Sequence, residues 1–218
     1  MTTRVSLRAL YQRLHRRYGP QHWWPGDTAF EVMVGAVLTQ NAAWANVERA
    51  IGNLAAAGCL DARRIAEMPS TELAELIRPS GYFNVKAGRL QNLCRWYLEK
   101  GGMEPLSALP TDALRREILA VNGVGPETAD DIVLYAFARA VFVIDAYTRR
   151  IFSRLGLCRG DESYEELRRV FEHALRGDAP LYNEYHALIV RHAKVACKTR
   201  PLCGSCCLVE VCPHAGGG

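Results

Sequence analysis

Four cysteines near the end of the chain have the residue type and spacing of a metal-binding loop. Cys197, Cys203, Cys206 and Cys212 follow the pattern C-x5-C-x2-C-x5-C in the segment CKTRPLCGSCCLVEVC. Four thiolates so close in sequence can wrap an iron–sulfur cube. Structural zinc more often uses two C-x2-C pairs set well apart, and this loop has one such pair. The spacing therefore favours a [4Fe–4S] cluster over zinc, with neighbouring Cys207 as a competing ligand.

A short turn with two glycines lies in the segment VNGVGPETAD, residues 121–130. Gly123 and Gly125 permit backbone conformations that are closed to other residues, and Pro126 suits the first position of a helix. Backbone N–H groups at such a turn, with a helix dipole behind them, can hold a phosphate. Taken alone, the segment could equally be a plain connection between two helices with a glycine cap.

An aspartate follows this turn in the segment VIDAYTRRIF. Asp145 stands directly before a predicted helix that carries Arg149 and Arg150. A carboxylate in such a place can stabilise developing positive charge and orient an attacking water. Asp is also a common N-cap residue, and the segment by itself favours that structural role.

Helices must position these residues, because apolar side chains recur at helical spacing along most of the chain. Residues 29–38 are apolar on almost all sides, which predicts a helix buried inside a bundle. No alternating pattern of useful length predicts a strand, and the apolar run at 140–145 is short enough to be a buried connection. We therefore expect an all-α protein of about ten helices. Three stripes carry this prediction: Trp44, Val47, Ile51 and Leu54; Leu90, Leu93, Cys94, Tyr97 and Leu98; Leu167, Val170, Phe171 and Ala174.

Candidate helix starts support this division into helices. Ser163 followed by Glu166 has the pattern of a capping box, and Ser70 and Thr111 are predicted N-caps. Gly101 and Gly102 are expected to close a long helix that begins near residue 84.

Composition restricts the class of protein further. The 218 residues are 49% hydrophobic and 23% charged, which is ordinary for a folded soluble protein. The net charge of +4 permits a polyanionic partner without demanding one. We find neither a membrane-spanning run nor a signal peptide, so we expect a cytoplasmic protein that makes no contact with a membrane. In that compartment we expect the eight cysteines to form no structural disulfides.

The glycine turn, the later aspartate and the four-cysteine loop, in this order, resemble the endonuclease III-like branch of the helix-hairpin-helix DNA glycosylases. The resemblance extends from about Phe30 to Cys212, although the first cysteine spacing is one residue shorter than is usual in the family. It implies a two-lobed all-α fold with a C-terminal [4Fe–4S] cluster loop. Residues 28–136 would form a central helical barrel with the hairpin, and residues 1–27 plus 137–218 the cluster domain. We expect a monomer, associated with the nucleoid if the source is bacterial.

The resemblance implies that the partner is double-stranded DNA with a damaged base. This DNA would lie across the groove between the lobes. The enzyme would flip the damaged nucleotide out of the stack, and Asp145 would be the catalytic carboxylate. Gln40 matches the family position that fills the gap left by the extruded base. The residues expected to bind DNA are Gln40, Gly123, Val124, Gly125, Arg149, Lys198 and Arg200.

Glu127 stands at the place where the bifunctional members of the family carry a lysine. That lysine attacks the sugar and forms a Schiff base, which permits strand cleavage. A glutamate cannot form an imine, so the sequence predicts a monofunctional glycosylase without lyase activity. Glu127 itself suits the first turn of a helix, where the dipole favours an acidic residue.

Three further stretches are similar to the 3-methyladenine glycosylase subgroup: WWP at 23–25, FEVMVGAVLTQNAAW at 30–44 and IRPSGYFN at 77–84. A 3-methylated adenine is electron-poor and cationic, so indole faces can bind it by stacking and cation–π attraction. Without the resemblance, the tryptophans are more simply explained as anchors of the fold. The residues expected to form the base pocket are Trp23, Trp24, Pro25, Trp44 and Glu127.

Two other functions compete with removal of alkylated bases. One is a mismatch glycosylase for uracil or thymine, or an endonuclease III-type pyrimidine glycosylase, whose pocket needs hydrogen-bond partners for the base edge. The other is a DNA-binding protein without catalysis.

His192 and Lys194, in the stretch RHAKVAC, could line a pocket or cap a helix.

Overall fold

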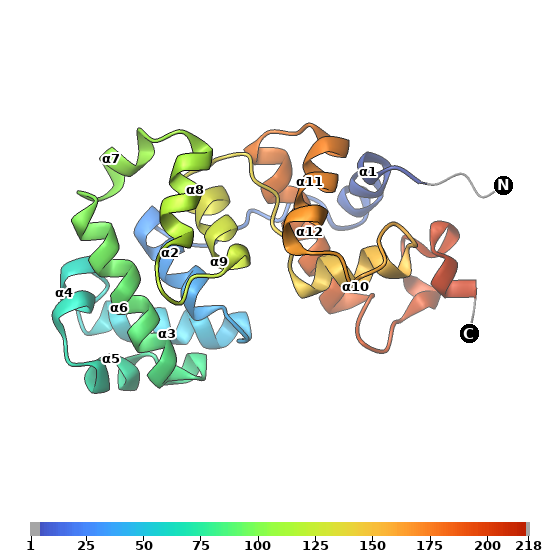
Figure 1. The fold of residues 1–218 in the computed structure, drawn as a ribbon. Helices are drawn as coiled ribbons and strands as arrows, with labels where there is room; N and C mark the ends of the chain where they lie inside the picture. Colours follow the sequence, from blue (N-terminus) through green and yellow to red (C-terminus); the bar gives the residue numbers. More distant parts are fainter. Residues whose placement is uncertain (1–4, 217–218) are drawn as a thin grey trace. The chain divides into compact units, whose positions relative to one another are not determined.

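The computed structural model describes residues 5–216, and this part of the chain is helical without a β-strand (Figure 1). The predicted all-α fold is therefore confirmed. The chain divides into two compact units, one of Met1–Trp23 with Ala140–Gly218 and the other of Trp24–Arg139. Among the described helices, none has the length and apolar character needed to cross a membrane.

The unit Trp24–Arg139 is a helical bundle built around α2 (Ala29–Leu38), which packs on α3, α6 and α9 (Figure 1). Every residue of α2 from Val32 to Leu38 is buried, as the apolar run predicted. Outside it, α4 and α5 pack on α6. The other elements of this unit are α3 (Trp44–Ala56), α4 (Ala62–Glu67), α5 (Ser70–Leu76), η1 (Arg78–Ser80), α6 (Phe83–Glu99), α7 (Met103–Ser107), α8 (Thr111–Leu119), α9 (Pro126–Asp131) and the π-helix η2 (Ile132–Ala136).

A buried lysine fixes the end of α2. The ammonium of Lys86, on α6, donates to the carbonyl oxygens of Leu38 at 2.8 Å and Ser80 at 2.7 Å. Burial, with the charge of Arg89, lowers the pKa of Lys86 to about 8, so the ammonium is still mostly charged at neutral pH. Because α2 ends at Leu38, this contact holds the start of the segment that carries Gln40.

Replacement of this lysine tests its structural role. Lys86→Met keeps most of the side-chain volume but leaves two buried carbonyl groups without their donor. We expect the free energy of unfolding to fall by about 2–4 kcal/mol, since each unsatisfied buried acceptor costs roughly 1–3 kcal/mol. Chemical denaturation of both proteins measures the difference. An unchanged midpoint would show that water replaces the ammonium.

The other unit is built from both ends of the chain, and α12 packs on α1 and α10 (Figure 1). Its core contains a group of aromatic rings, in which Phe142 lies against Phe171, Tyr182 and Tyr185. Residues 141–144 are buried without regular structure, so the short apolar run is a connection as predicted. The elements are α1 (Leu7–Tyr18), α10 (Ala146–Arg154), α11 (Tyr164–Leu175), α12 (Ala179–Val195), η3 (Cys203–Ser205), η4 (Val209–Val211) and η5 (Pro213–Gly216).

At the helix starts, one predicted cap is present and two are not. Ser163 and Glu166 form the predicted capping box at the start of α11. The N-cap predictions for Ser70 and Thr111 were wrong, because each is the first residue inside its helix. The preceding prolines, Pro69 and Pro110, already have the extended backbone of an N-cap residue, so each helix begins one residue earlier than expected.

Candidate active site and cysteine loop

The hairpin between α8 and α9 contains two glycines with different conformations. Gly123 has φ +93°, which only glycine adopts readily. Gly125 has φ −92°, so the prediction that its conformation also demands glycine was wrong. A Cβ added at Gly125 would meet no protein atom within 4 Å, and the residue is exposed. Glycine at this position therefore leaves open space beside the backbone, ahead of Pro126, which opens α9 as predicted.

Two contacts hold the hairpin in shape. Arg115 on α8 binds both carboxylate oxygens of buried Asp130 on α9, at 2.5 and 3.1 Å. Val124 is buried, and its N–H donates to the carbonyl of Val121 at 3.1 Å. The side chain of Val124 thus anchors the turn to the unit, which leaves the neighbouring backbone as the part that is presented outward.

Gln40 follows the end of α2 and contacts this hairpin. Its Nε2 donates to the carbonyl of Gly123 at 3.3 Å and to Thr128 Oγ1 at 2.9 Å. Arg89 Nη1, from α6, donates to Gln40 Oε1. Arg89 was not singled out from the sequence, because nothing in its spacing along α6 points to the hairpin.

Three aromatic rings gather in this unit, and two of them were predicted to line a base pocket. Trp24 lies edge-on to Trp44, with ring centroids 5.2 Å apart, and also contacts Tyr135 at 5.2 Å. All three side chains are half-buried. Gly35 on α2 makes room for Trp24, because a Cβ there would lie 3.1 Å from the indole. We refer to Trp24, Trp44 and Tyr135 as the aromatic cluster.

The remaining predicted pocket residues are Trp23, Pro25 and Glu127. Pro25 is exposed, next to Trp24. Trp23 ends the other unit, so the aromatic cluster is described without it. Glu127 is exposed in the first turn of α9, where an acidic residue was expected.

An exposed aromatic residue was missed in the sequence. Tyr82 is 73% exposed and has φ +47°, a left-handed conformation that is uncommon for a residue other than glycine. It is the N-cap residue of α6 and follows Gly81, which ends η1. An apolar ring held outward in this way can stack on a planar ligand.

Asp145 is the N-cap of α10 and is buried. Its Oδ1 accepts hydrogen bonds from the backbone N–H of Thr148 at 2.6 Å and from the Thr148 hydroxyl at 2.8 Å. Its Oδ2 lies 3.6 Å from Nε2 of His186 on α12, too far for a strong hydrogen bond. One carboxylate oxygen therefore caps the helix, and the other faces an imidazole.

The surroundings of Asp145 favour its charged form. Burial alone would raise the pKa of the carboxyl, but the His186 imidazole and the two Thr148 donors outweigh it, and the pKa lies below the usual value. Asp145 is accordingly a carboxylate at neutral pH. A fixed negative charge in a buried setting interacts with a nearby cation far more strongly than one in water does.

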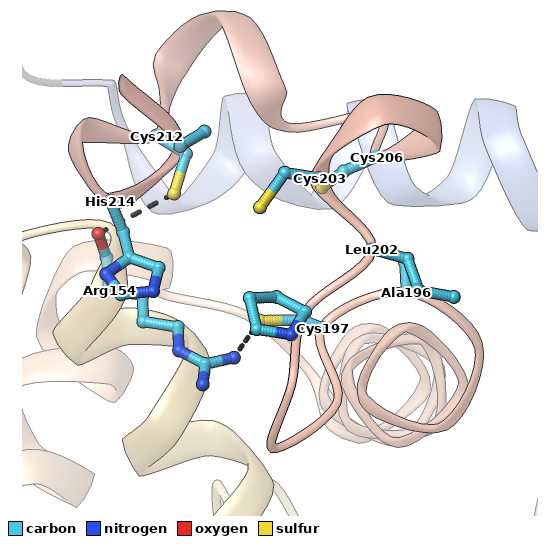
Figure 2. Close-up of a pocket in the computed structure, with 10 residues that line it drawn as sticks. Arg154, Ala196, Cys197, Leu202, Cys203, Cys206, Cys212 and His214 are labelled. Carbon is cyan, nitrogen blue, oxygen red and sulfur yellow. Dashed lines mark hydrogen bonds between the residues drawn. The ribbon is translucent and has the colours of Figure 1, made fainter. Parts of the chain in front are cut away.

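The four predicted metal ligands line a single pocket in the cysteine loop (Figure 2). Cys197 follows α12, and Cys203, Cys206 and Cys212 come from the turns after it. Ala196, Pro201, Leu202, Ala215, Arg154 and His214 complete the wall. Cys207 is absent from the lining of this pocket. No described group of three or more potential ligands is arranged to hold a metal ion.

Arg154 was missed in the sequence, although it touches the first cysteine of the loop (Figure 2). Its Nη1 lies 3.2 Å from Cys197 Sγ and donates to the carbonyl of Lys198 at 2.6 Å, while Nη2 donates to the carbonyl of Thr199 at 2.8 Å. The guanidinium thus ties the last turn of α10 to the start of the loop. Nothing in the sequence around Arg154 indicates this role, because Arg154 ends an ordinary amphipathic helix.

Removal of this guanidinium should loosen the loop. Arg154→Met retains the aliphatic stem but loses the charged donor, and we expect a loss of about 1–3 kcal/mol in the free energy of unfolding. Arg159→Met is a suitable control, because Arg159 contacts Asp161 on the surface. Equal denaturation midpoints for the two variants would contradict the assigned role.

His192 and Lys194 have different environments. His192 is buried, with Nδ1 2.8 Å from the Tyr18 hydroxyl and Nε2 3.6 Å from Cys206 Sγ. Burial lowers the pKa of His192 to about 4, so the imidazole is neutral at neutral pH. Lys194 is exposed on the last turn of α12. His192 therefore supports the cysteine loop rather than a base pocket in this unit.

The basic residues predicted to bind DNA differ in how freely they can move. Arg149 Nη1 donates to the carbonyl of Glu162 at 2.7 Å, which holds its side chain against the loop before α11. Lys198 and Arg200 are exposed in the cysteine loop. Arg150 donates to the carbonyl of Cys197 at 3.0 Å and so supports the same loop from α10.

The hairpin between α8 and α9 and the helices around it define a helix-hairpin-helix protein. The family of HhH-GPD superfamily base excision DNA repair proteins matches residues 34–176. The chain belongs to this family, in its endonuclease III-like branch of DNA glycosylases.

Known proteins are similar over almost the whole chain. A Methanocaldococcus jannaschii protein named as a DNA repair glycosylase, MJ1434, is 47% identical over 206 residues, covering 93% of this chain and 94% of the relative. The structure of Helicobacter pylori 3-methyladenine DNA glycosylase (MagIII) bound to 1,N6-ethenoadenine is 30% identical, with a TM-score of 0.79, and the match covers 87% of this chain and 98% of that chain. A non-covalent endonuclease III–DNA complex is 25% identical, with a TM-score of 0.84 and coverage of 99% and 98%.

Proposed function

We propose that the protein is a monofunctional glycosylase that removes alkylated bases of the 3-methyladenine type from double-stranded DNA. The observation that carries this specificity is the aromatic cluster, in which the half-buried rings of Trp24, Trp44 and Tyr135 pack against one another. A cationic, electron-poor purine binds such rings by stacking and cation–π attraction. The similarity to the 3-methyladenine glycosylase MagIII supports this assignment.

Contacts to DNA come from the hairpin and the residues around it. Open space beside Gly125 lets a phosphate approach the backbone, and the start of α9 favours an anion. Gln40 fills the gap left by the extruded base, and exposed Tyr82 offers a ring on which a neighbouring base can stack. The other unit adds the exposed cations Lys198 and Arg200, and Arg149 on α10. The relatives solved as DNA complexes support this partner.

The proposed reaction is hydrolysis of the N-glycosidic bond. Flipping exposes that bond at a cost of a few kcal/mol of unstacking. As the bond breaks, the base leaves and the sugar gains positive charge, which the Asp145 carboxylate stabilises. The same carboxylate orients a water, takes its proton as it attacks the sugar carbon, and leaves an abasic site. An alkylated base leaves readily, so the site needs little activation of the leaving group.

Glu127 and the distribution of lysines support hydrolysis without strand cleavage. The sequence contains four lysines: Lys86, Lys100, Lys194 and Lys198. Lys86 is buried with both carbonyl contacts described above, and Lys100 is paired with Glu117 at the end of α6. The place after the hairpin holds Glu127, which cannot form a Schiff base.

Trapping with borohydride tests this point. We expect wild type to form no covalent adduct with DNA that contains an abasic site, and Glu127→Lys to form one, because a lysine there can condense with the sugar aldehyde. Glu127→Gln is the matched control and should form none. The readout is a protein band shifted by the mass of the oligonucleotide on a denaturing gel. A band with wild-type protein would show that one of its own lysines has lyase activity.

The cysteine loop fits an iron–sulfur cluster better than a zinc ion. Structural zinc more often uses two C-x2-C pairs set well apart, and this loop has one such pair. In a [4Fe–4S] cluster each thiolate binds a different iron, so the sulfurs surround a larger body, which suits four cysteines that line one pocket. Burial raises the pKa of Cys206, so its thiolate needs positive charge close by. When bound, the cluster would supply iron to which the four thiolates coordinate, and it would hold the loop folded.

Endonuclease III relatives favour a second function, which is removal of damaged or mismatched pyrimidines. A panel of duplexes separates the two. Wild-type protein is incubated with duplexes that contain 3-methyladenine, uracil, thymine opposite guanine, or an oxidised pyrimidine, and the free bases are separated by chromatography. Release of 3-methyladenine supports our proposal, and release of pyrimidines alone supports the second function. Binding to every duplex without release of any base would identify a DNA-binding protein without catalysis.

A further inference from the structure

Gln40 is held in place by partners that leave its amide no spare N–H. The Nε2 group donates one hydrogen bond to the Gly123 carbonyl and one to Thr128 Oγ1, while Oε1 accepts from Arg89. The orientation of this amide is fixed by its partners, because a guanidinium can only donate and a carbonyl can only accept. Both N–H groups are therefore used inside the protein. To reach a gap in DNA, Gln40 must leave these partners.

Arg89 crosses the hairpin at the same point. A Cβ added at Gly123 would clash with the Cγ of Arg89, so the aliphatic stem lies directly on the turn. The side chain is half-buried, with its guanidinium at the hairpin beside Gln40. Glycine at position 123 thus serves the left-handed backbone and also the passage of this stem.

The charge of Arg89 has no carboxylate partner among the described residues. Among the ion pairs of residues 5–216, none involves Arg89, whereas Arg115 on the same hairpin binds the carboxylate of Asp130. The acceptor that Arg89 does use is the neutral amide of Gln40. Bonds from a guanidinium to a phosphate are charge-assisted, often bidentate and about twice as strong as neutral ones. A phosphate brought to the hairpin would therefore displace the amide.

We propose that Arg89 is a DNA phosphate-binding residue that is masked by Gln40 and exposed when Gln40 moves into the gap at a flipped or missing base. The inference rests on the proposed contact of this unit with DNA. Departure of Gln40 frees the guanidinium for phosphate, and binding of phosphate removes one of the bonds that hold Gln40. The two events favour each other reciprocally, as linkage requires. Arg89 acts as a positioning residue for Gln40 and takes no part in bond cleavage.

The salt dependence of binding measures this exchange, because each phosphate contact adds about 0.9 to the slope of log K against log salt. Fluorescence anisotropy is recorded at several salt concentrations for two matched duplexes, one undamaged and one with a tetrahydrofuran abasic analogue. For wild type we expect the slope to be steeper by about 0.9 on the abasic duplex. Arg89→Met should show the shallow slope on both duplexes. Gln40→Ala should show the steep slope on both, because Arg89 is then unmasked from the start.

Further variants separate this exchange from a general loss of charge or of structure. Arg95→Met removes an exposed arginine from the same helix and should keep the wild-type difference between the duplexes. Arg89→Met keeps the stem that crosses Gly123, and its thermal unfolding is compared with that of wild type. Arg89→Lys retains a cation and should retain the difference in slope. If Arg89→Met proves unfolded, the Gln40→Ala and Arg89→Lys slopes decide the question.

Two results would overturn the inference. One is equal slopes for wild type on the two duplexes, and the other is a wild-type difference that persists in Arg89→Met. Failure of the proposed function gives a different result: wild type would release no alkylated base. The salt slopes on the two duplexes are measured independently of base release, so the two failures can be told apart.

Discussion

Asp145→Asn is expected to lower the rate of base release by about 10²- to 10⁴-fold while binding to DNA is kept. The amide oxygen of Asn can still accept from the Thr148 N–H, so the cap of α10 remains. What is lost is the negative charge beside His186. In the proposed mechanism this charge stabilises the sugar cation and takes the proton of the attacking water. Single-turnover excision with enzyme in excess measures the chemical step.

The control for this variant is Asp161→Asn, because Asp161 is an exposed aspartate of the same unit, paired with Arg159. Its rate should equal that of wild type. A rate for Asp145→Asn within threefold of wild type, with normal unfolding, would exclude the carboxylate as the catalytic group.

The pH dependence follows from the lowered pKa of Asp145. The carboxylate stays ionised in the folded protein below the usual value of about 3.9, so excision should not lose this group between neutral pH and about pH 5. Since the folded pKa is lower than the unfolded one, ionisation of Asp145 stabilises the fold above the unfolded value. This contribution is lost as the pH falls through the folded pKa.

Cys206→Ser is expected to remove most of the bound iron and to destabilise the cysteine loop. Cys206 lines the pocket with the other three predicted ligands and lies 3.6 Å from the imidazole of His192. Wild type purified without oxygen should carry about four irons and four sulfides per chain. If the loop contributes about 3 kcal/mol through its ligands, the unfolding temperature falls by roughly 6–12 °C in a chain of this size.

Cys207→Ser provides a matched control one residue away. Cys207 does not line the pocket, so this variant should keep its iron, its visible absorption and its unfolding temperature. Iron and sulfide analysis beside calorimetry measures both variants. Loss of iron from Cys207→Ser but not from Cys206→Ser would reassign the third ligand, and equal zinc content in place of iron would reject the cluster.

Local patterns made several parts of the structure predictable. The run at 29–38 has apolar residues on all sides, and such a helix is stable only inside a bundle, as α2 is. Pro126 begins α9 and Ser163 caps α11, and both effects depend only on residues within one turn of the helix. The four cysteines could be grouped from spacing alone because the loop that joins them is short.

Contacts between distant segments could not be predicted in the same way. Arg89 lies 49 positions from Gln40, and Arg154 lies 43 positions from Cys197, so neither pair has a sequence signal. Tyr135 joins Trp24 through a π-helical turn, η2, that ordinary helical spacing does not predict. Gly125 was assigned a conformational need that it does not have, because a glycine with negative φ looks the same in sequence as one with positive φ.

The most direct test of the central claim is chromatography of the free bases released from methylated duplex DNA, with the product strand examined on a denaturing gel. The account predicts that wild type releases 3-methyladenine and leaves an unbroken strand with an abasic site, and that Asp145→Asn releases none above background. Release of uracil or thymine from mismatched duplexes, with no methylated base released, would contradict it and would return the aromatic cluster to a structural role.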